Sequence, residues 1–326
     1  MHYQKLDHGR VGCLLCPHHC QLNPGQKGFC LNRRNQEGTL YTLNYGGVAA
    51  MHLDPIEKKP LYHFYPGEQI LSFGTFGCSL NCRFCQNSSL ARSTSGEDSN
   101  LLPEECVELA KKYNSFAIAY TYNEPFIWFE HVLETAKLAK DQGIKNVLVT
   151  NGYYETEPWE QLAPFIDAMN IDLKGNEAFY ARVCKGELMP VLKTIKSAFK
   201  RGIHVEIAHL VVTGENDRME DFQEIIREIE SISPRIPLHI SRYFPNYELS
   251  NAPTNPQILE DFYQRAKETL EFVYLGNLIT ETGQHTLCPR CGARLIERTG
   301  YQTVVHRELK QGKCPDCGHL LYGVFK

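Results

Sequence analysis

The sequence has no long apolar run and does not begin like a secreted protein. Among its 326 residues, no apolar segment approaches the ~20 residues that a helix needs to cross a bilayer. The start, MHYQKLDHGR, is polar and lacks the apolar stretch of a secretory signal. We therefore expect a cytoplasmic protein without a membrane partner, in a compartment that keeps thiols reduced.

Positive charge is also scarce. Basic residues occur in short pairs such as Arg33-Arg34, the formal net charge is -4 and the pI is about 6.4. This balance disfavours nucleic acid as a partner. The hydrophobic and charged fractions, 42% and 22%, are ordinary for a globular protein and exclude disorder over most of the chain. The length suits one large α/β domain with additions.

Cysteine, by contrast, is abundant, and 11 of its 13 copies fall into three groups. In a reducing compartment such groups indicate metal sites rather than disulfides. Two cysteines, Cys106 and Cys184, lie outside the groups. The groups predict a Cys-rich metal-binding region at 1–66, a central domain at 67–280 and a zinc-ribbon domain at 281–326. Their members are Cys13, Cys16, Cys20 and Cys30, then Cys78, Cys82 and Cys85, and finally Cys288, Cys291, Cys314 and Cys317.

The middle of the chain alternates strand-like and helix-like segments. About six strand–helix repeats predict parallel strands joined by right-handed crossovers, as in an incomplete (β/α) barrel or a doubly wound sheet. Polar residues follow several of these strands, at the edge where such folds collect their active sites. The predicted strands are 70–76, 116–120, 146–150, 167–172, 204–212 and 237–240, and the predicted helices are 102–113, 126–142, 189–200, 219–230 and 257–272.

The segment 77–87, GCSLNCRFCQN, holds three cysteines at the spacing C-x3-C-x2-C. Thiolates are soft ligands that suit iron–sulfur clusters or zinc. A [4Fe–4S] cluster usually takes one protein thiolate per iron, so three would leave one iron open to a small molecule. A zinc site with a distant fourth ligand is the alternative that spacing alone leaves open.

These residues resemble a known family. The three cysteines, Phe84 before the last of them, Gln86-Asn87, and the segment 54–67 (DPIEKKPLYHFYPG) are similar to the radical S-adenosylmethionine (SAM) superfamily, in the branch related to pyruvate formate-lyase activating enzymes. Within that branch the chain resembles, over nearly its whole length, the radical SAM enzyme of the AmmeMemoRadiSam system. The resemblance implies an α/β fold with an incomplete (β/α)6 barrel and a [4Fe–4S] cluster on Cys78, Cys82 and Cys85.

The resemblance also implies a reaction and partners. Such an enzyme cleaves SAM reductively to a 5′-deoxyadenosyl radical, which abstracts hydrogen from a substrate. It would need an electron donor such as flavodoxin or ferredoxin, and it would work with protein partners of the AmmeMemoRadiSam system. The alternatives are a glycyl-radical-enzyme activating enzyme and, from other classes, a non-catalytic zinc-binding adaptor or a nucleic-acid-binding zinc-ribbon protein.

Further site residues follow from their positions relative to the family's motifs. Tyr122-Asn123-Glu124 stands where relatives carry a Gly-Gly-Glu type motif that binds the amino group of SAM, with Asn123 in place of glycine. Asp172 and Lys174 are expected above the cofactor and are candidates for catalysis. Cys184 is a third candidate if its loop folds over the barrel mouth, and a structural thiol otherwise. The complete set expected to contact the cofactor is Tyr122, Asn123, Glu124, Thr150, Asn151, Asp172 and His239.

The two flanking cysteine groups suggest closed sites. Two C-x2-C-G knuckles, at Cys288 and Cys291 and at Cys314 and Cys317, are typical of a structural zinc ribbon, with rubredoxin-type iron as the alternative. The N-terminal Cys13, Cys16, Cys20 and Cys30 predict either a zinc ion or an auxiliary iron–sulfur cluster.

Overall fold

A curved sheet of eight strands forms the centre of the molecule, in the order β15-β14-β13-β12-β11-β10-β8-β7. The computed structural model describes residues 2–93, 99–305 and 309–325. Neighbouring strands from β8 to β15 are parallel, and β7 runs antiparallel to β8 at one edge. The strands are β7 Ala50–Pro55, β8 Gln69–Gly74, β10 Ala117–Tyr120, β11 Lys145–Thr150, β12 Ala168–Asp172, β13 His204–Val211, β14 Leu238–Arg242 and β15 Val273–Gly276.

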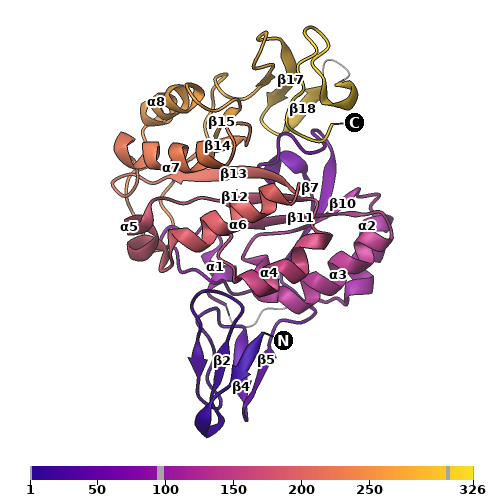
Figure 1. The fold of residues 1–326 in the computed structure, drawn as a ribbon, viewed down its shortest axis with the longest axis vertical. Helices are drawn as coiled ribbons and strands as arrows, with labels where there is room; N and C mark the ends of the chain where they lie inside the picture. The colour runs from indigo at the N-terminus through magenta and orange to yellow at the C-terminus, as the bar shows by residue number, and fades with distance from the viewer. Residues whose placement is uncertain (1, 94–98, 306–308, 326) are drawn as a thin grey trace.

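Helices connect the parallel strands, and Figure 1 shows α3, α4, α6 and α7 side by side along one face of the sheet. In α7 the buried residues Phe222, Ile225, Ile226 and Ile229 form a single apolar stripe, which packs on the sheet while the other side stays polar. The helices are α1 Ser88–Ala91, α2 Pro103–Lys112, α3 Phe129–Asp141, α4 Thr156–Leu162, α5 Glu177–Phe179, α6 Leu188–Lys200, α7 Met219–Ile232 and α8 Pro256–Lys267.

This architecture confirms the expected α/β fold with a partial barrel, and it adds elements that were not predicted. The parallel sheet continues into β15, whose four residues fall just after a predicted helix that in fact ends at Lys267. The edge strand β7 lies within the segment 1–66, and half of its residues are exposed. Its side chains therefore lack the apolar pattern that marks the inner strands.

The N-terminal residues form two small antiparallel sheets that project from one end of the molecule (Figure 1). One sheet contains β1 Tyr3–Lys5, β2 Val11–Cys13 and β3 Gln21–Leu22, and the other contains β4 Arg33–Gln36 and β5 Thr39–Thr42. A third pairing, between β6 Gly47–Val48 and β9 Ser99–Asn100, follows. Several residues of this region, including Val11, Leu15 and Leu22, belong to the same buried core as the central sheet.

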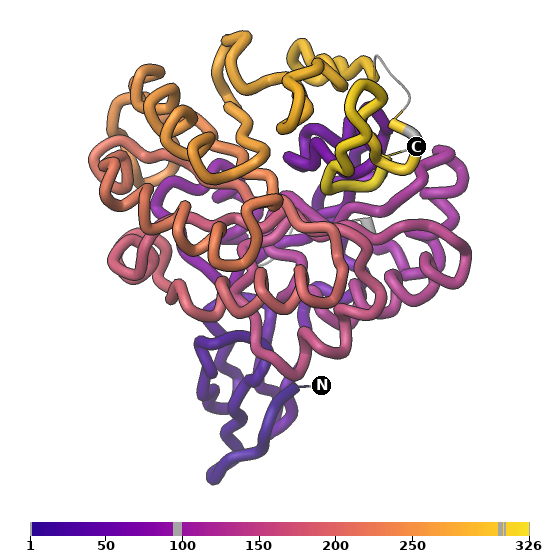
Figure 2. The backbone as a smooth tube through the Cα atoms, turned by 45° about the horizontal axis from the view of Figure 1, so that its top comes forward, coloured from indigo at the N-terminus to yellow at the C-terminus, as the bar shows by residue number. Residues whose placement is uncertain are grey.

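The C-terminal residues form a three-stranded antiparallel sheet at the opposite end of the molecule from the N-terminal sheets (Figures 1 and 2). Its strands are β16 Thr286–Leu287, β17 Arg294–Thr299 and β18 Gln302–Val305. Arg298 joins this sheet to the barrel. Its buried guanidinium donates to the carbonyl of Tyr62 at 2.8 Å and lies 4.1 Å from the centre of the Tyr62 ring. In the part of the chain that the structure describes, no helix combines the length and the apolar character needed to span a membrane.

Candidate active site

The cysteine loop leaves the carboxyl end of β8 and borders a cavity of about 720 Å³. Cys78, Cys82 and Cys85 all line this cavity. Gly77, which precedes the loop, has a φ of +86°, and a side chain there would collide with the carbonyl of Cys30 and the side chain of Asn32. The tight approach of the N-terminal region therefore requires glycine at this position.

The spacing of these three thiols differs from that of the C-terminal cysteines. A tetrahedral zinc ion holds its sulfurs at about 2.3 Å, and so about 3.8 Å from one another. Within residues 2–93, 99–305 and 309–325, only the C-terminal cysteines bring three or more ligand atoms within 4.8 Å of one another. Cys78, Cys82 and Cys85 line one cavity, but their three sulfurs do not all lie within that limit of one another. This arrangement fits a [4Fe–4S] cluster, in which each cysteine binds a different iron.

The thiols need a metal to ionise. Burial raises the pKa of Cys78 and of Cys85, and a hydrogen bond with Cys184 together with burial raises that of Cys82. Without a cation these groups would therefore stay protonated at neutral pH. Metal binding supplies the positive charge that stabilises the three thiolates.

Glu124 connects the ends of β10 and β11 beneath the cysteine loop. Its carboxylate is buried and accepts hydrogen bonds from the backbone N–H of Phe126 at 2.9 Å and of Asn151 at 2.8 Å. The hydroxyl of Thr150 donates to both carboxylate oxygens, at 2.9 and 3.0 Å. Burial raises the pKa of Glu124 to about 7, although these hydrogen bonds act in the opposite direction.

Asn151 extends this network to the cysteine loop. Its side-chain amide donates to the hydroxyl of Ser79 at 3.1 Å and lies 3.7 Å from the sulfur of Cys78. Glu124, Thr150 and Asn151, predicted from two separate stretches of sequence, thus form one hydrogen-bonded group, and all three line the cavity.

Asn123 has a clear structural reason to replace glycine. Its amide donates to the carbonyl of Gly77 at 2.8 Å, and its side-chain oxygen accepts from the backbone N–H of Thr75 at 3.1 Å. The side chain therefore fixes the backbone segment, Thr75 to Gly77, that leads into the cysteine loop. It also borders the cavity, as expected for this position.

A second polar group at the cavity was not predicted. Tyr122, in the left-handed region at φ +72°, donates its hydroxyl to Asp54 at 2.8 Å, and Lys59 pairs with the same carboxylate at 2.7 Å. Burial opposes ionisation of Asp54, but the hydrogen bonds from Lys59 and Tyr122 lower its pKa to about 2. Asp54 and Lys59 both lie in the segment 54–67 that carries the family resemblance. Only the pairing of β7 with β8 shows that this segment reaches the cavity.

The buried carboxylate of Glu206, on β13, anchors one wall of the barrel. It accepts from the backbone N–H of Tyr62 and His63 at 3.0 and 2.7 Å, and pairs with His204 at 2.9 Å and His239 at 2.6 Å. Burial alone would raise the pKa of Glu206, but the two histidines hold it well below its ordinary value. His239, expected as a cofactor contact, lines the cavity while bound to this carboxylate.

The three candidate catalytic residues occupy different places. Asp172 and Lys174 line the cavity and form an ion pair at 2.7 Å. Burial alone would lower the pKa of Lys174, but the negative charge of Asp172 raises that pKa well above its ordinary value. Cys184 is fully buried behind the cysteine loop, beside Cys82, and does not line the cavity. The structure therefore does not bring Cys184 into the cavity with the other two candidates.

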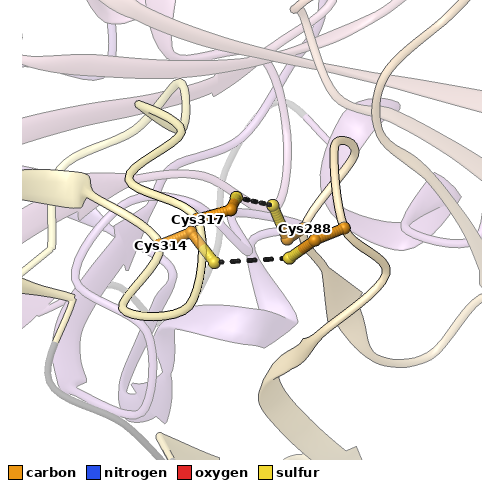
Figure 3. Close-up of side chains that lie close together, drawn as sticks. Cys288, Cys314 and Cys317 are labelled. Carbon is orange, nitrogen blue, oxygen red and sulfur yellow. Dashed lines mark hydrogen bonds between the residues drawn. The ribbon is translucent and has the colours of Figure 1, made fainter.

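The C-terminal cysteines form a closed site. Cys288 lies 3.6 Å from Cys317, and Cys291 lies 3.7 Å from Cys314, between sulfur atoms. Figure 3 shows Cys314 and Cys317 on one loop facing Cys288 on another. These separations match the ~3.8 Å expected around one tetrahedral ion, and four thiolates leave no position open.

The N-terminal cysteines lie near one another without such contacts. Cys13 and Cys30 are buried, and Cys16 and Cys20 are partly buried. Neither neighbouring histidine adds a ligand to this set. His18 lies 2.7 Å from the carbonyl of Ser79, and His19 lies 2.9 Å from the carboxylate of Glu155.

The fold and the loop together define a class of protein, and comparisons with known proteins agree. The profile of the Radical SAM superfamily matches residues 73–229, from β8 through most of α7. The chain belongs to the radical SAM superfamily and is therefore a radical-generating enzyme.

Individual relatives span different parts of the chain. Uncharacterized protein MJ0808 of Methanocaldococcus jannaschii is 43% identical over 327 residues, which cover 98% of each protein. The pyruvate formate-lyase-activating enzyme of Clostridium pasteurianum is 23% identical, over 48% of this chain and 67% of its own length. The crystal structure of Streptococcus suis SuiB bound to S-adenosylmethionine has a TM-score of 0.50 at 15% identity, over 65% of this chain and 49% of SuiB, and shares the fold alone.

Proposed function

We propose that this chain binds a [4Fe–4S] cluster through Cys78, Cys82 and Cys85 and cleaves SAM reductively, as the radical SAM enzyme of the AmmeMemoRadiSam system. When bound, the cluster and SAM supply a 5′-deoxyadenosyl radical that abstracts a hydrogen atom from the substrate. The observation that best supports this proposal is the shared cavity, which the three thiols line together with Glu124 and Asn151.

The residues of the cavity orient SAM and exclude water. Glu124 offers a carboxylate to the ammonium group of SAM, and the amide of Asn151 lies between that carboxylate and the cysteine loop. Thr150 fixes the carboxylate, and Asn123 fixes the loop. A volume of about 720 Å³ is large enough for a cofactor-sized molecule together with a small substrate group. The walls protect a reactive carbon radical from solvent.

Lys174, Asp172 and His239 complete the polar lining. The Asp172–Lys174 pair is the candidate for positioning the substrate, since both side chains face the cavity and neither belongs to the Glu124 network. A one-electron donor such as flavodoxin or ferredoxin would reduce the cluster in the cytoplasm. The C-terminal cysteines would bind zinc and stabilise the ribbon against Tyr62 and β15.

A glycyl-radical-enzyme activating function is the second candidate. The similarity to the Clostridium enzyme favours it, as does 29% identity over 35% of the chain to a putative glycyl-radical enzyme activating enzyme of Methanocaldococcus jannaschii, named MJ1632. A non-catalytic adaptor is disfavoured, because an adaptor has no use for three thiols and a buried carboxylate around one cavity.

The test is formation of 5′-deoxyadenosine. The protein is reconstituted anaerobically with iron and sulfide, reduced with dithionite and supplied with SAM, and the product is measured by mass spectrometry. We expect the wild type and the matched control Cys106→Ala to form it, and Cys82→Ala to form none. Equal product from Cys82→Ala would refute the role of the loop. A glycyl radical signal on an added partner protein would select the second candidate.

A further inference from the structure

The four N-terminal cysteines come from one hairpin and the loop that follows it. Cys13 ends β2, and its backbone N–H donates to the carbonyl of Cys20 at 2.9 Å, just before β3 begins. Cys16 lies in the connection between them. The chain then turns back through Gly25, at φ +82°, so that Cys30 returns to the same place.

The separation of these thiols does not match a single ion. The structure gathers the ribbon cysteines to within 4.8 Å of one another, so it does bring thiols together where a mononuclear site requires it. No three of Cys13, Cys16, Cys20 and Cys30, all within the described part of the chain, meet that limit. Cys78, Cys82 and Cys85, to which the family assigns a [4Fe–4S] cluster, do not meet that limit either.

A buried arginine beside the four cysteines has one N–H donor without an acceptor among the described residues. Arg33 is 2% exposed, and its two terminal nitrogens bind the carboxylate of Glu130 at 2.8 and 2.7 Å. Its Nε has no hydrogen-bond acceptor among the described residues, although it is buried. The guanidinium is close enough to interact electrostatically with Cys13 and Cys30. An unpaired buried N–H is costly, and a cluster sulfur would accept its hydrogen bond.

A backbone N–H group supplies a second hydrogen-bond donor to these cysteines. The backbone N–H of Phe29 lies 3.4 Å from the sulfur of Cys20. Hydrogen bonds of this kind stabilise thiolates bound to iron–sulfur clusters and tune their potentials. The Nε2 atoms of the neighbouring His18 and His19 face Ser79 and Glu155, and the four cysteines make a complete ligand set without them.

We propose that Cys13, Cys16, Cys20 and Cys30 bind a second [4Fe–4S] cluster rather than a zinc ion. Four thiolates give every iron a protein ligand, so this centre is closed and serves electron storage or structure instead of SAM binding. It lies next to the first site, because the carbonyl of Cys30 and the side chain of Asn32 pack against Gly77, directly before Cys78.

The test uses the full chain with its first site removed. In the triple variant Cys78→Ala, Cys82→Ala and Cys85→Ala, prepared anaerobically, we expect about four iron, four sulfide and one zinc per chain. We also expect a paramagnetic cluster signal after reduction. Its outcome does not depend on SAM cleavage, so it can fail while the proposed function holds.

Two further variants keep the test decisive. Adding Cys20→Ser and Cys30→Ser to the triple variant should remove the remaining iron and leave the single zinc, with an unchanged circular dichroism spectrum. The matched control Cys106→Ala should hold about eight iron, twice one cluster. Any other metal content in the folded triple variant overturns the proposal, above all about two zinc ions and no iron.

Discussion

Replacing Glu124 with alanine removes the acceptor of three buried donors. Among the described residues, the backbone N–H groups of Phe126 and Asn151 would lose the carboxylate that accepts from them, whereas the Thr150 hydroxyl can turn to Tyr154. An unsatisfied buried donor costs about 1–3 kcal/mol, so two of them cost on the order of 4 kcal/mol. Glu124→Gln keeps one acceptor oxygen but turns an NH2 group toward a donor, and should cost about half as much.

The assay is anaerobic denaturation of the cluster-free protein, followed by near-UV circular dichroism. The exposed Glu108, which pairs with Lys111, supplies the control, because Glu108→Ala should cost less than about 0.5 kcal/mol. If Glu124→Ala is no less stable than this control, the carboxylate does not hold β10 and β11 together. The SAM affinity of folded Glu124→Gln should fall about 10- to 100-fold, as expected for loss of a charged hydrogen bond.

The pH dependence of Glu124 has a definite sign. Its pKa rises from 4.5 to about 7 in the folded protein, so the folded state keeps this proton over a range where the unfolded state releases it. The stabilisation from this group is complete below about pH 4.5 and is lost as the pH rises toward 7. Relative to Glu124→Gln, the stability of the wild type should therefore fall across this range, and a flat difference would contradict the raised pKa.

Three further predictions concern other parts of the molecule. Glu206→Ala should destabilise the protein by about 3–5 kcal/mol, because it leaves buried histidines without their carboxylate. Since the pKa of Glu206 is depressed, its contribution to stability is present above pH 4.5 and is lost as the pH falls. A variant as stable as the wild type at pH 7 would contradict this. Lys174→Met removes a cation near Cys82, so a redox titration should find the cluster potential lowered by on the order of 50 mV, and a raised potential would refute the placement. Cys314→Ser should release the ribbon's one metal ion, measured by mass spectrometry, and loosen Arg298 from the barrel; retention of that ion would disprove the four-thiolate site.

Local patterns made much of this structure predictable. The three loop cysteines and the two C-x2-C-G knuckles depend on spacing within a few residues, and the structure brings each set to a single place. The inner strands β8, β10 and β11 were predictable because burial on both faces leaves short, mostly apolar runs.

Contacts between distant segments were not predictable. The sequence contains Glu206 and His239, but only the parallel pairing of β13 with β14 brings them to 2.6 Å. Asp54 and Tyr122 meet because the exposed strand β7 pairs with β8, and an exposed strand has no apolar signature. Cys184 was a candidate for the barrel mouth, and only the packing of the segment after α5 shows that it lies behind Cys82.

The open iron can be tested directly by electron paramagnetic resonance of the reduced protein. The measurement uses a chain in which Cys20→Ser and Cys30→Ser leave the loop of Cys78, Cys82 and Cys85 as the only cysteine site for a cluster. We predict a reduced [4Fe–4S] signal whose g-values change when SAM is added, because SAM occupies the iron that has no protein thiolate. A signal that SAM leaves unchanged at saturating concentration, or a loop that binds zinc and gives no signal, would contradict the proposed chemistry.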